Sequence, residues 1–359
     1  MADLTALKLK AEAGDAAAQF SVGNAYHLGL AGAAKDLGEA RRWYEKAALQ
    51  SHRDAQVNLA MLHVQGGDKE SGVYWFTQAA EQGDGEAMYH LGHLTEQVDW
   101  FRRSAEKGCA RGQLMWGEQL IARDPAGALT HLRAAAEQGL ADAQYNAAAL
   151  LFNSGQEPAA VEARGWLLKA AAQGHAEALY TSGRNYRTGQ GVPVDLEKAL
   201  GCYYAAAEQG HARAQFALGL MLASGSGLAA PAPEKAAAFY IKAVQQAHGG
   251  AAHNLAIMQL KGSGVPVDLE SARELLEYAI SLGEDDALFS LGLLDLNTGD
   301  ALSAAVWAHL SMRRCPQGQG AKLLEAAQAR LDEAQRQDAA QRAQAWTRPK
   351  KTLMLLTKS

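Results

Sequence analysis

Three side chains with metal-ligand chemistry follow one another at three-residue steps in the segment HLGHLTE. His90, His93 and Glu96 would lie along one flank of a helix, and two imidazoles with a carboxylate are ligands that zinc or iron accepts. A related segment has Asn58 and Met61 at the positions of the two histidines, so the cluster is not a recurring feature. We predict no metal and no cofactor, and metal binding at this cluster stays open as an alternative.

Nucleophilic catalysis has little support in the sequence. Cys202 is expected in the middle of a core-facing helix and Cys109 follows a glycine, but neither has a histidine partner that the sequence reveals. Buried packing is the usual role of a free cysteine. The glycine-rich segments GQGVPVD and GSGVPVD lack the Lys-Ser or Lys-Thr of a phosphate-binding loop, and no strand precedes them. The sequence therefore predicts interhelical turns here, and a chain that is not an enzyme.

The overall composition is that of a folded protein without a broad basic surface. The chain has 359 residues and a formal net charge of -5, with 48% hydrophobic and 20% charged residues. Nucleic-acid binding normally needs a basic face, so we expect no nucleic-acid partner. The start, MADLTALKLK, lacks the apolar core of a secretion signal, and no window is apolar enough for a membrane span. Three widely separated cysteines form no disulfide framework, which favours a cytoplasmic location.

One short segment occurs twice in closely similar form, as QGHAEALYTSG from Gln173 and as QGHARAQFALG from Gln209. Its glycine recurs every 25 to 37 residues, and we call the residue at each recurrence the marker residue. The nine marker residues are Gly14, Ser51, Gly83, Gly108, Gly139, Gly174, Gly210, Ala247 and Gly283. Positions +4 and +9, counted from each marker, hold only glycine or alanine, and position +6 is nearly always large and apolar. Because the residue preferences at these three positions keep the same spacing from every marker, they indicate a tandem array of repeats.

Each unit of the array is expected to be a helical hairpin. The small and apolar residues after a marker have helical spacing and predict a first helix, helix A. Recurring glycine at +9 would weaken that helix by about 1 kcal/mol relative to alanine, so we expect the backbone of a neighbouring helix to approach it closely. A loop and an aromatic-containing second helix, helix B, follow, and the marker residue would end helix B in a left-handed conformation. One hairpin cannot bury its apolar stripe alone, so the units must stack.

The predicted fold is an all-α, right-handed solenoid of about nine helix hairpins. The array would occupy residues 1–314 and would be closed by a capping helix in residues 315–347, with one long amphipathic helix from Ala321 to Trp346. The basic and apolar tail, residues 348–359, is expected to be disordered. The unit between Gly83 and Gly108 lacks a glycine loop, so its two helices would meet through a very short turn.

These repeats resemble the Sel-one-like repeat (SLR) family, which is related to the tetratricopeptide (TPR) repeat. The resemblance is carried by the segment from Ala170 to Gly210 and by weaker copies from about Ala11 to Gly292, while ALSAAVWAHLSMRR resembles the closing unit of many bacterial members. It implies a TPR-like superhelix and a scaffold or adaptor function with varied partners. Some secreted members carry a cysteine pair in each repeat, and the unpaired cysteines here depart from that pattern.

A polar column at position +7 is the candidate binding surface. In the related tetratricopeptide fold helix A forms the concave groove and its asparagines hold extended peptides. An asparagine side chain can donate to carbonyls and accept from amides, and two arginines one turn apart would add attraction for an acidic partner. A plain solvated stripe is the alternative. The predicted partner-binding residues are Asn58, His90, Asn146, Thr181, Arg184, Arg187, Asn254 and Ser290.

The sequence thus predicts a protein-interaction scaffold or adaptor that binds a protein or peptide in its concave groove. A preformed groove loses little conformational entropy on binding. One alternative is an immunity-type or regulatory inhibitor that wraps an enzyme or toxin. The other is a hydrolase, with a β-lactamase-like activity as suggested for some secreted relatives, or a metal-dependent enzyme.

Overall fold

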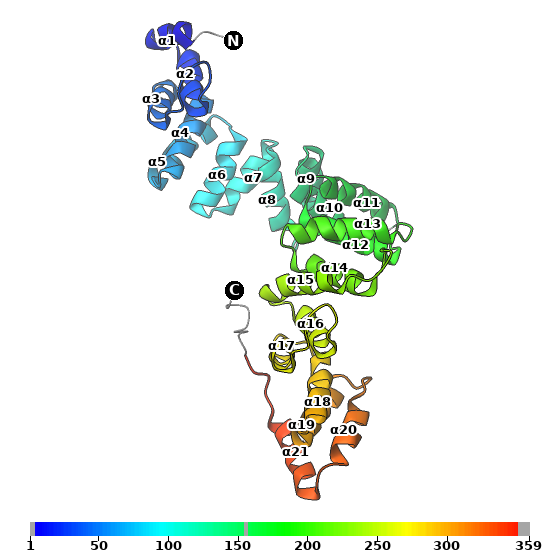
Figure 1. Ribbon diagram of the computed structural model, residues 1–359. Helices are drawn as coiled ribbons and strands as arrows, with labels where there is room; N and C mark the ends of the chain where they lie inside the picture. The colour runs from blue at the N-terminus through cyan, green and yellow to red at the C-terminus, as the bar shows by residue number, and fades with distance from the viewer. Residues whose placement is uncertain (1–3, 154–156, 351–359) are drawn as a thin grey trace. The chain divides into compact units, whose positions relative to one another are not determined.

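The computed structural model describes residues 4–153 and 157–350, and every regular element in these ranges is an α-helix, as the repeat pattern predicts (Figure 1). The chain divides into two compact units, Met1–Gln173 and Gly174–Ser359, which are described separately. None of the helices in the described ranges is both long and apolar enough to cross a bilayer. Most of the tail predicted to be disordered, from residue 351 on, lies outside the described residues.

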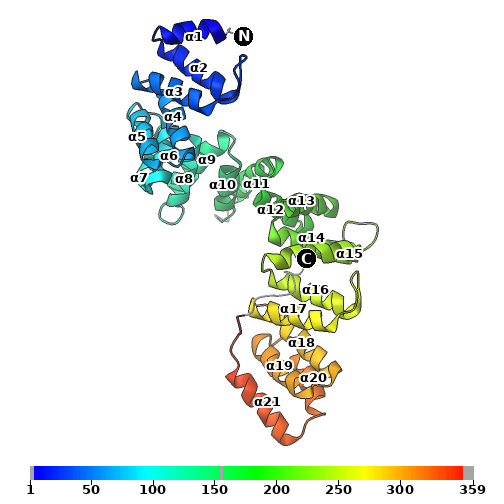
Figure 2. The same cartoon turned by 60° about the vertical axis from the view of Figure 1, so that its left-hand side comes forward.

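Nine pairs of helices A and B form most of the described chain, as predicted. In the first unit, α1 (Leu4–Glu12) precedes five pairs: α2 (Ala16–Leu28) with α3 (Leu37–Leu49), α4 (Arg53–Gln65) with α5 (Lys69–Glu81), α6 (Gly85–Thr95) with α7 (Val98–Glu106), α8 (Ala110–Leu120) with α9 (Pro125–Glu137), and α10 (Ala141–Asn153) with α11 (Glu157–Ala172). The second unit has four: α12 (Ala176–Thr188) with α13 (Leu196–Glu208), α14 (Ala212–Ser224) with α15 (Pro233–Gln245), α16 (Gly249–Lys261) with α17 (Leu269–Ser281), and α18 (Asp286–Thr298) with α19 (Ala301–Arg314). Within each unit the pairs stack in chain order, so each is a helical solenoid (Figure 2).

The marker residues end the helices that precede them, as predicted. All nine have a positive φ. This includes the two marker residues that are not glycine, Ser51 with φ 63° and Ala247 with φ 58°. A left-handed residue stops an α-helix and turns the chain. The next helix A then starts within a few residues, and the residue after the marker often caps it, as Asp15, His52, Asp84 and His211 do.

Other helices do approach the +9 glycines closely, but side chains rather than backbone make the nearest contacts. Aromatic rings of helix B lie against Gly23, Gly92, Gly183 and Gly219, and leucine side chains lie against Gly117 and Gly292. A Cβ added at Gly219 would come within 2.5 Å of the Tyr240 ring, and one at Gly183 within 2.9 Å of the Tyr203 ring. Gly23 meets Tyr44 in the same way. The three tyrosine side chains are buried. The missing side chain on helix A therefore makes room for the aromatic ring of its own hairpin partner.

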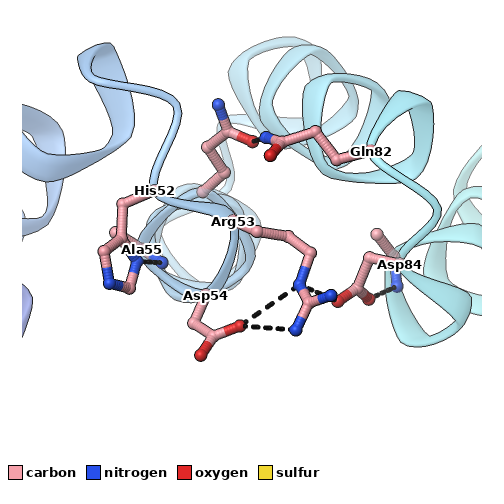
Figure 3. Close-up of polar contacts among 8 residues, drawn as sticks. His52, Arg53, Asp54, Ala55, Gln82 and Asp84 are labelled. Atoms are coloured by element: carbon pink, nitrogen blue, oxygen red, sulfur yellow. Dashed lines mark hydrogen bonds and ion pairs between the residues drawn. The ribbon is translucent and has the colours of Figure 1, made fainter. Parts of the chain in front are cut away.

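Buried glutamines connect successive pairs, a feature that the sequence analysis did not identify. Gln56 of α4 donates to the carbonyl of Ala48 at 3.2 Å and accepts from Gln82, at the end of α5, at 2.7 Å. Gln215 repeats both contacts with Ala207 and Gln246. Figure 3 shows the first of these junctions, where Gln82 lies near an ion pair between Arg53 of α4 and Asp84, the cap of α6. A buried amide must find partners, so these bonds help to fix the register of neighbouring pairs.

The predicted single helix from Ala321 to Trp346 is wrong, because the structure has two helices there. α20 (Gly320–Gln328) and α21 (Glu333–Ala345) both pack on α19 and cover the last pair. Asp332 starts α21 with a capping box, in which its side chain accepts from the Gln335 amide and the Gln335 side chain accepts from the Asp332 amide. This local cap competes with helix continuation, and the buried side chain of Leu331 turns inward at the same place.

Replacing Gly219 with alanine is expected to destabilise the second unit by about 1–3 kcal/mol, because the new methyl group overlaps the Tyr240 ring. Gly201 in α13 is the matched control, since a Cβ there meets nothing within 4 Å. Gly201→Ala should raise the free energy of unfolding by up to about 1 kcal/mol through helix propensity. Urea unfolding followed by circular dichroism measures both, and equal effects of the two changes would contradict the close-approach explanation.

Gln56→Met is expected to lower the free energy of unfolding by about 1–3 kcal/mol, because it leaves the Ala48 carbonyl and the Gln82 amide without their buried partner. Gln65→Met, on the exposed end of the same helix, serves as the control and should stay within about 0.5 kcal/mol of the parent. Denaturant unfolding of both variants is the measurement. A Gln56 variant as stable as the Gln65 variant would show that the amide contacts contribute nothing.

Candidate functional site

The candidate site is the solvent-facing side of the A helices, which we call the A-helix face and define by positions +3, +7, +10, +13 and +14 after each marker. All nine side chains at +7 are half-buried. On one side of them in the helical wheel, positions +4 and +8 are mostly buried, and on the other side, position +3 is mostly exposed. The column therefore borders the solvent rather than the core. Its members do not all present the same chemistry, however, because several are already engaged with helix B.

In the first unit, Asn58 joins a hydrogen-bonded group around a buried tyrosine. The Tyr44 hydroxyl donates to Asn24 Oδ1 at 2.6 Å, and Asn58 Nδ2 donates to the same oxygen at 3.3 Å. His27 Nδ1 lies 3.1 Å from the hydroxyl. Burial raises the pKa of Tyr44 to about 12 while its bond with Asn58 opposes the rise, so the phenol stays protonated. Asn58 is thus held in one orientation.

The histidine cluster does not assemble as the sequence suggested. Glu96 lies beyond the end of α6, in a left-handed conformation with φ 58°, and starts the very short predicted turn to α7. His90 stacks on Phe76 with ring centroids 4.9 Å apart, and burial lowers its pKa. His93 packs edge-on against Phe101. The two imidazoles are therefore engaged by aromatic rings, and no group of three potential metal ligands occurs in the described residues.

The remaining predicted residue of the first unit, Asn146 in α10, has a partner on the preceding helix A. Its Nδ2 donates to Glu118 Oε1 at 2.8 Å. Burial raises the pKa of Glu118, and the bond with Asn146 opposes that rise. An amide has two N–H groups and an oxygen, so this contact leaves part of the Asn146 side chain available on the A-helix face.

In the second unit the predicted residues occupy two kinds of surroundings. Thr181 is half-buried in α12, while Arg184 and Arg187 of the same helix are exposed. Ser290 of α18 pairs with His253 of α16, with 2.8 Å between the hydroxyl oxygen and Nε2. Asn254 donates to the hydroxyl of Tyr240 at 3.4 Å. Asn254 therefore contacts Tyr240 in α15 much as Asn58 lies beside Tyr44 in α3.

At α13 the pairing of a buried tyrosine with an asparagine at +7 of the next helix A is missing, and a cavity is present instead. The buried tyrosine there is Tyr203, and position +7 of the next helix A is Ala217, which has no amide to offer. The Tyr203 hydroxyl is instead hydrogen-bonded by Arg187, which opposes the rise in the pKa of Tyr203 that burial causes. A cavity of about 510 Å³ lies between α12, α13 and α14 and is lined by Ala217, Tyr203 and Arg187, among others. We call it the cationic cavity.

The wall of the cationic cavity combines arginine, aromatic rings and hydroxyl groups. Arg213 of α14 lies over the Tyr180 ring, 4.9 Å from its centroid, and pairs with Glu177 at 2.7 Å. His248 stacks on Phe216 with ring centroids 4.4 Å apart and contributes its edge. Ser224 and Ser226 add two hydroxyl groups. Among the described residues that line the cavity there are two arginines and no carboxylate.

A second cavity occupies the equivalent place two pairs further on, between α16, α17 and α18. Its volume is about 300 Å³, and we call it the apolar cavity. Leu260 stands where Arg187 stands in the first cavity, 13 residues after the marker, and Leu269 begins α17 as Leu196 begins α13. Leu293 replaces Leu220 and is 42% exposed. The same arrangement of two A helices and one helix B thus forms a cationic cavity in one place and an apolar cavity in the other.

Sequence reasoning placed Arg187 at the site but missed most of the residues around it. Arg213 and His248 were not identified, and Tyr180 and Phe216 were noted only as members of the large, apolar +6 column. The available signal was Ala217, the smallest residue of the +7 column. A small residue in a column of asparagine and serine leaves space, but only the packed structure shows that the space opens outward.

The three cysteines have surroundings that suppress thiol reactivity. All are free, and burial raises the pKa of Cys202 and of Cys109. The pKa of Cys315 is raised by burial and by acidic neighbours, Asp286 first among them. The thiolate is the nucleophilic form, so a raised pKa lowers the fraction of each thiol that is nucleophilic near neutral pH.

Comparison with protein families finds one family model, described as Sel1 repeat, that matches most of the chain. The matched segments are residues 16–52, 53–84, 98–109, 112–140, 141–175, 176–211, 212–248 and 250–284. Seven of these segments each correspond to one hairpin of the structure, 98–109 covers α7 alone, and α6 and the hairpin of α18 and α19 lie outside the matches.

Two solved structures resemble this chain along most of its length. A protective antigen of uropathogenic Escherichia coli with an SLR fold has a TM-score of 0.66 and 24% identity, over 96% of this chain and 94% of that one. A Sel1 repeat protein from Oxalobacter formigenes has a TM-score of 0.56 and 29% identity, over 81% and 90%. The first resemblance shows the fold alone.

One curated relative matches a shorter part of the chain. It is named chitin synthase regulatory factor 3, from Schizosaccharomyces pombe, and is 30% identical over 134 residues. The match covers 32% of this chain and only 14% of that much longer protein.

Stability of the second unit is expected to fall as the pH drops below about 6.5, in part through His248. Burial, and secondly the charge of Arg213, lower its pKa in the folded state, and its Nδ1 accepts from the Ala251 amide as a helix cap. A lowered histidine pKa gives stability that is complete above the unfolded pKa of about 6.5 and is lost as the pH falls through the folded pKa. His248→Asn keeps a capping oxygen and removes the titration.

Unfolding midpoints at pH 8 and pH 5 test this expectation. The difference between the two midpoints should be smaller in His248→Asn than in the parent, while at pH 8 the two proteins should be similar. An unchanged pH dependence in the variant would refute a role for His248.

Proposed function

This chain belongs to the Sel1 repeat family, and on that basis we propose that it is a non-enzymatic scaffold or adaptor that binds a protein or peptide on its A-helix face. Sel1 repeat proteins are typically protein-interaction scaffolds. The proposal carries this general property to a defined surface, with Asn58, His90 and Asn146 on the first unit. On the second unit it uses Thr181, Arg184, Arg187, Asn254 and Ser290.

The observation that supports this surface most directly is the fixed orientation of its polar side chains. Asn58 and Asn254 hydrogen-bond within groups anchored by the buried Tyr44 and Tyr240, and Asn146 bonds to Glu118. Each asparagine keeps donor or acceptor capacity for a partner. Groups that are already ordered lose little entropy on binding, so a preformed surface of this kind suits the recognition of peptide backbone.

A regulatory role is the form of scaffold activity that the comparisons favour. The curated relative is named as a regulatory factor of chitin synthase, which is a statement about that protein. For this chain we propose only the shared principle, that it acts by binding another protein rather than by transforming a substrate. The raised thiol pKa values and the engaged histidines support this choice over a hydrolase or a metal-dependent enzyme.

We also propose a reducing, cytoplasmic location. Cys109, Cys202 and Cys315 are all free. Proteins of oxidising compartments commonly use cysteines as disulfides, and the arrangement here shows no such use.

Selection of peptides from a phage library of random linear 12-mers, on the immobilised full chain, tests the proposal. We expect enriched peptides whose affinity falls at least about tenfold on Asn146→Arg or on Asn254→Arg, because the substitution removes the preformed amide and puts a long cation in its place. Fluorescence anisotropy with the labelled peptides is the measurement. Circular dichroism should show that both variants remain folded.

The matched controls place the same side chain on helix B. Thr130→Arg in α9 and Ala238→Arg in α15 are exposed positions and should leave peptide affinity unchanged. If no peptide is enriched, or if neither asparagine variant weakens binding, the A-helix face is not the binding surface.

A further inference from the structure

In the second unit, α13, α15 and α17 each face position +7 of the next helix A. The residue at that position differs in the three cases. At α13 position +7 of the next helix A is Ala217, and the cationic cavity is open. At α15 it is Asn254, whose amide reaches the Tyr240 hydroxyl. At α17 it is Ser290, and the apolar cavity is open. The two cavities, at α13 and α17, therefore lie on either side of α15, where the Asn254 amide contacts the hydroxyl of the buried Tyr240.

The cationic cavity has the chemistry of a carboxylate site. Arg187 and Arg213 supply guanidinium groups, which bind carboxylates through charge-assisted hydrogen bonds. The Tyr203 hydroxyl adds a neutral polar group. The Ser224 hydroxyl already donates to the Leu220 carbonyl at 2.9 Å and pairs with the Ser226 hydroxyl. Glu177 pairs with Arg213 and compensates part of its charge, whereas Arg187 and the neighbouring Arg184 are exposed. The local balance is thus positive, with a floor of aromatic rings that lowers the exposure of a bound carboxylate to water.

The apolar cavity has the chemistry of a pocket for an aliphatic or aromatic side chain. Ile257, Leu260, Leu293 and Leu294 line it, with Leu269 at its edge. Leu293 and Leu269 are 42% and 48% exposed. Removing such apolar surface from water is favourable, so an incoming apolar side chain would be held there. Lys261 adds a positive charge at the rim.

The two cavities lie on the same face at a separation that a short peptide can span. Both are formed by positions +7, +10, +11 and +14 of their A helices, and two steps between neighbouring A helices separate them. Packed helices lie about 8–10 Å apart, which gives about 16–20 Å in total. An extended chain advances about 3.3 Å per residue, so five or six residues bridge the distance.

We propose that the second unit recognises an extended peptide segment that places an aspartate or glutamate side chain in the cationic cavity and a large apolar side chain, five or six residues away, in the apolar cavity. Asn254, which lies between the two, then faces the peptide backbone. This inference rests on the proposed scaffold function and specifies its partner.

The experiment uses the peptides selected on the full chain and asks what they contain. We expect a consensus with an acidic residue five or six positions from Leu, Ile, Met or Phe. Replacing the acidic residue of a peptide with its amide, Asp with Asn or Glu with Gln, should weaken binding at least about tenfold. The affinity of the acidic peptide should also fall as NaCl is raised from 50 to 500 mM, because screening weakens ion pairing.

Three variants of the chain test the cavities separately. Arg187→Glu replaces one of the two cations that line the cationic cavity with an anion. Ala217→Asn fills the cavity with an amide, and because positions 58 and 254 already carry asparagine, this variant should fold normally. Leu293→Gln makes the exposed wall of the apolar cavity polar. Each should reduce the affinity of the acidic–apolar peptide at least about tenfold. Lys235→Glu on α15 and Leu282→Gln at the end of α17 are matched controls and should leave it unchanged.

The possible outcomes separate this inference from the proposed function. Enriched peptides that lose affinity on Asn254→Arg, but lack the acidic residue or ignore Arg187→Glu and Ala217→Asn, would overturn the inference and leave the scaffold function in place. A failure to enrich any peptide would overturn both. An acidic consensus with no apolar requirement, unaffected by Leu293→Gln, would overturn the two-cavity arrangement.

Discussion

The close approach of helix B to the small residue at +9 of helix A is the contact on which the rest of the structure depends. Gly183 and Gly219 leave no side chain between the helices, so Tyr203 and Tyr240 lie directly on the backbone. That contact sets how near the two helices of a hairpin lie, and it buries a large ring that a single hairpin could not otherwise cover. It also directs the phenol hydroxyl toward position +7 of the next helix A, where a polar partner or a cavity must meet it.

The helix backbone repeats while the side chains at +7 differ, which explains how this fold can acquire binding sites without additional helices. The backbone around α13, α15 and α17 is equivalent, yet an alanine, an asparagine or a serine at +7 gives three different surfaces. A change of one side chain opens or closes a site because the helices themselves are held by the buried contacts beneath it. The glutamine bonds between pairs, such as Gln215 with Gln246, keep neighbouring frames in register.

The departures from expectation share one cause, which is that local hydrogen bonds and packing compete with helical periodicity. Glu96 has helical spacing from His93, but it lies in a left-handed turn because the shortened unit must reverse direction there. The segment after Gln328 has an amphipathic pattern, but the capping box at Asp332 starts a new helix. The side chains at +7 are all half-buried, but their surroundings differ, because Asn58 and Asn254 are hydrogen-bonded to other polar groups of the chain.

The sequence by itself determined the repeat length, the all-α hairpins, the left-handed marker residues and the need for glycine at +9. These features are local or periodic, so that φ preferences and helical spacing express them directly. Only the tertiary structure decided that Arg187 and Arg213, on two different helices, border one cavity, and that Ala217 leaves it open while Asn254 meets the hydroxyl of Tyr240. A cavity is the space between side chains that are far apart in the chain, and its size depends on how the helices pack, which spacing along the sequence does not encode.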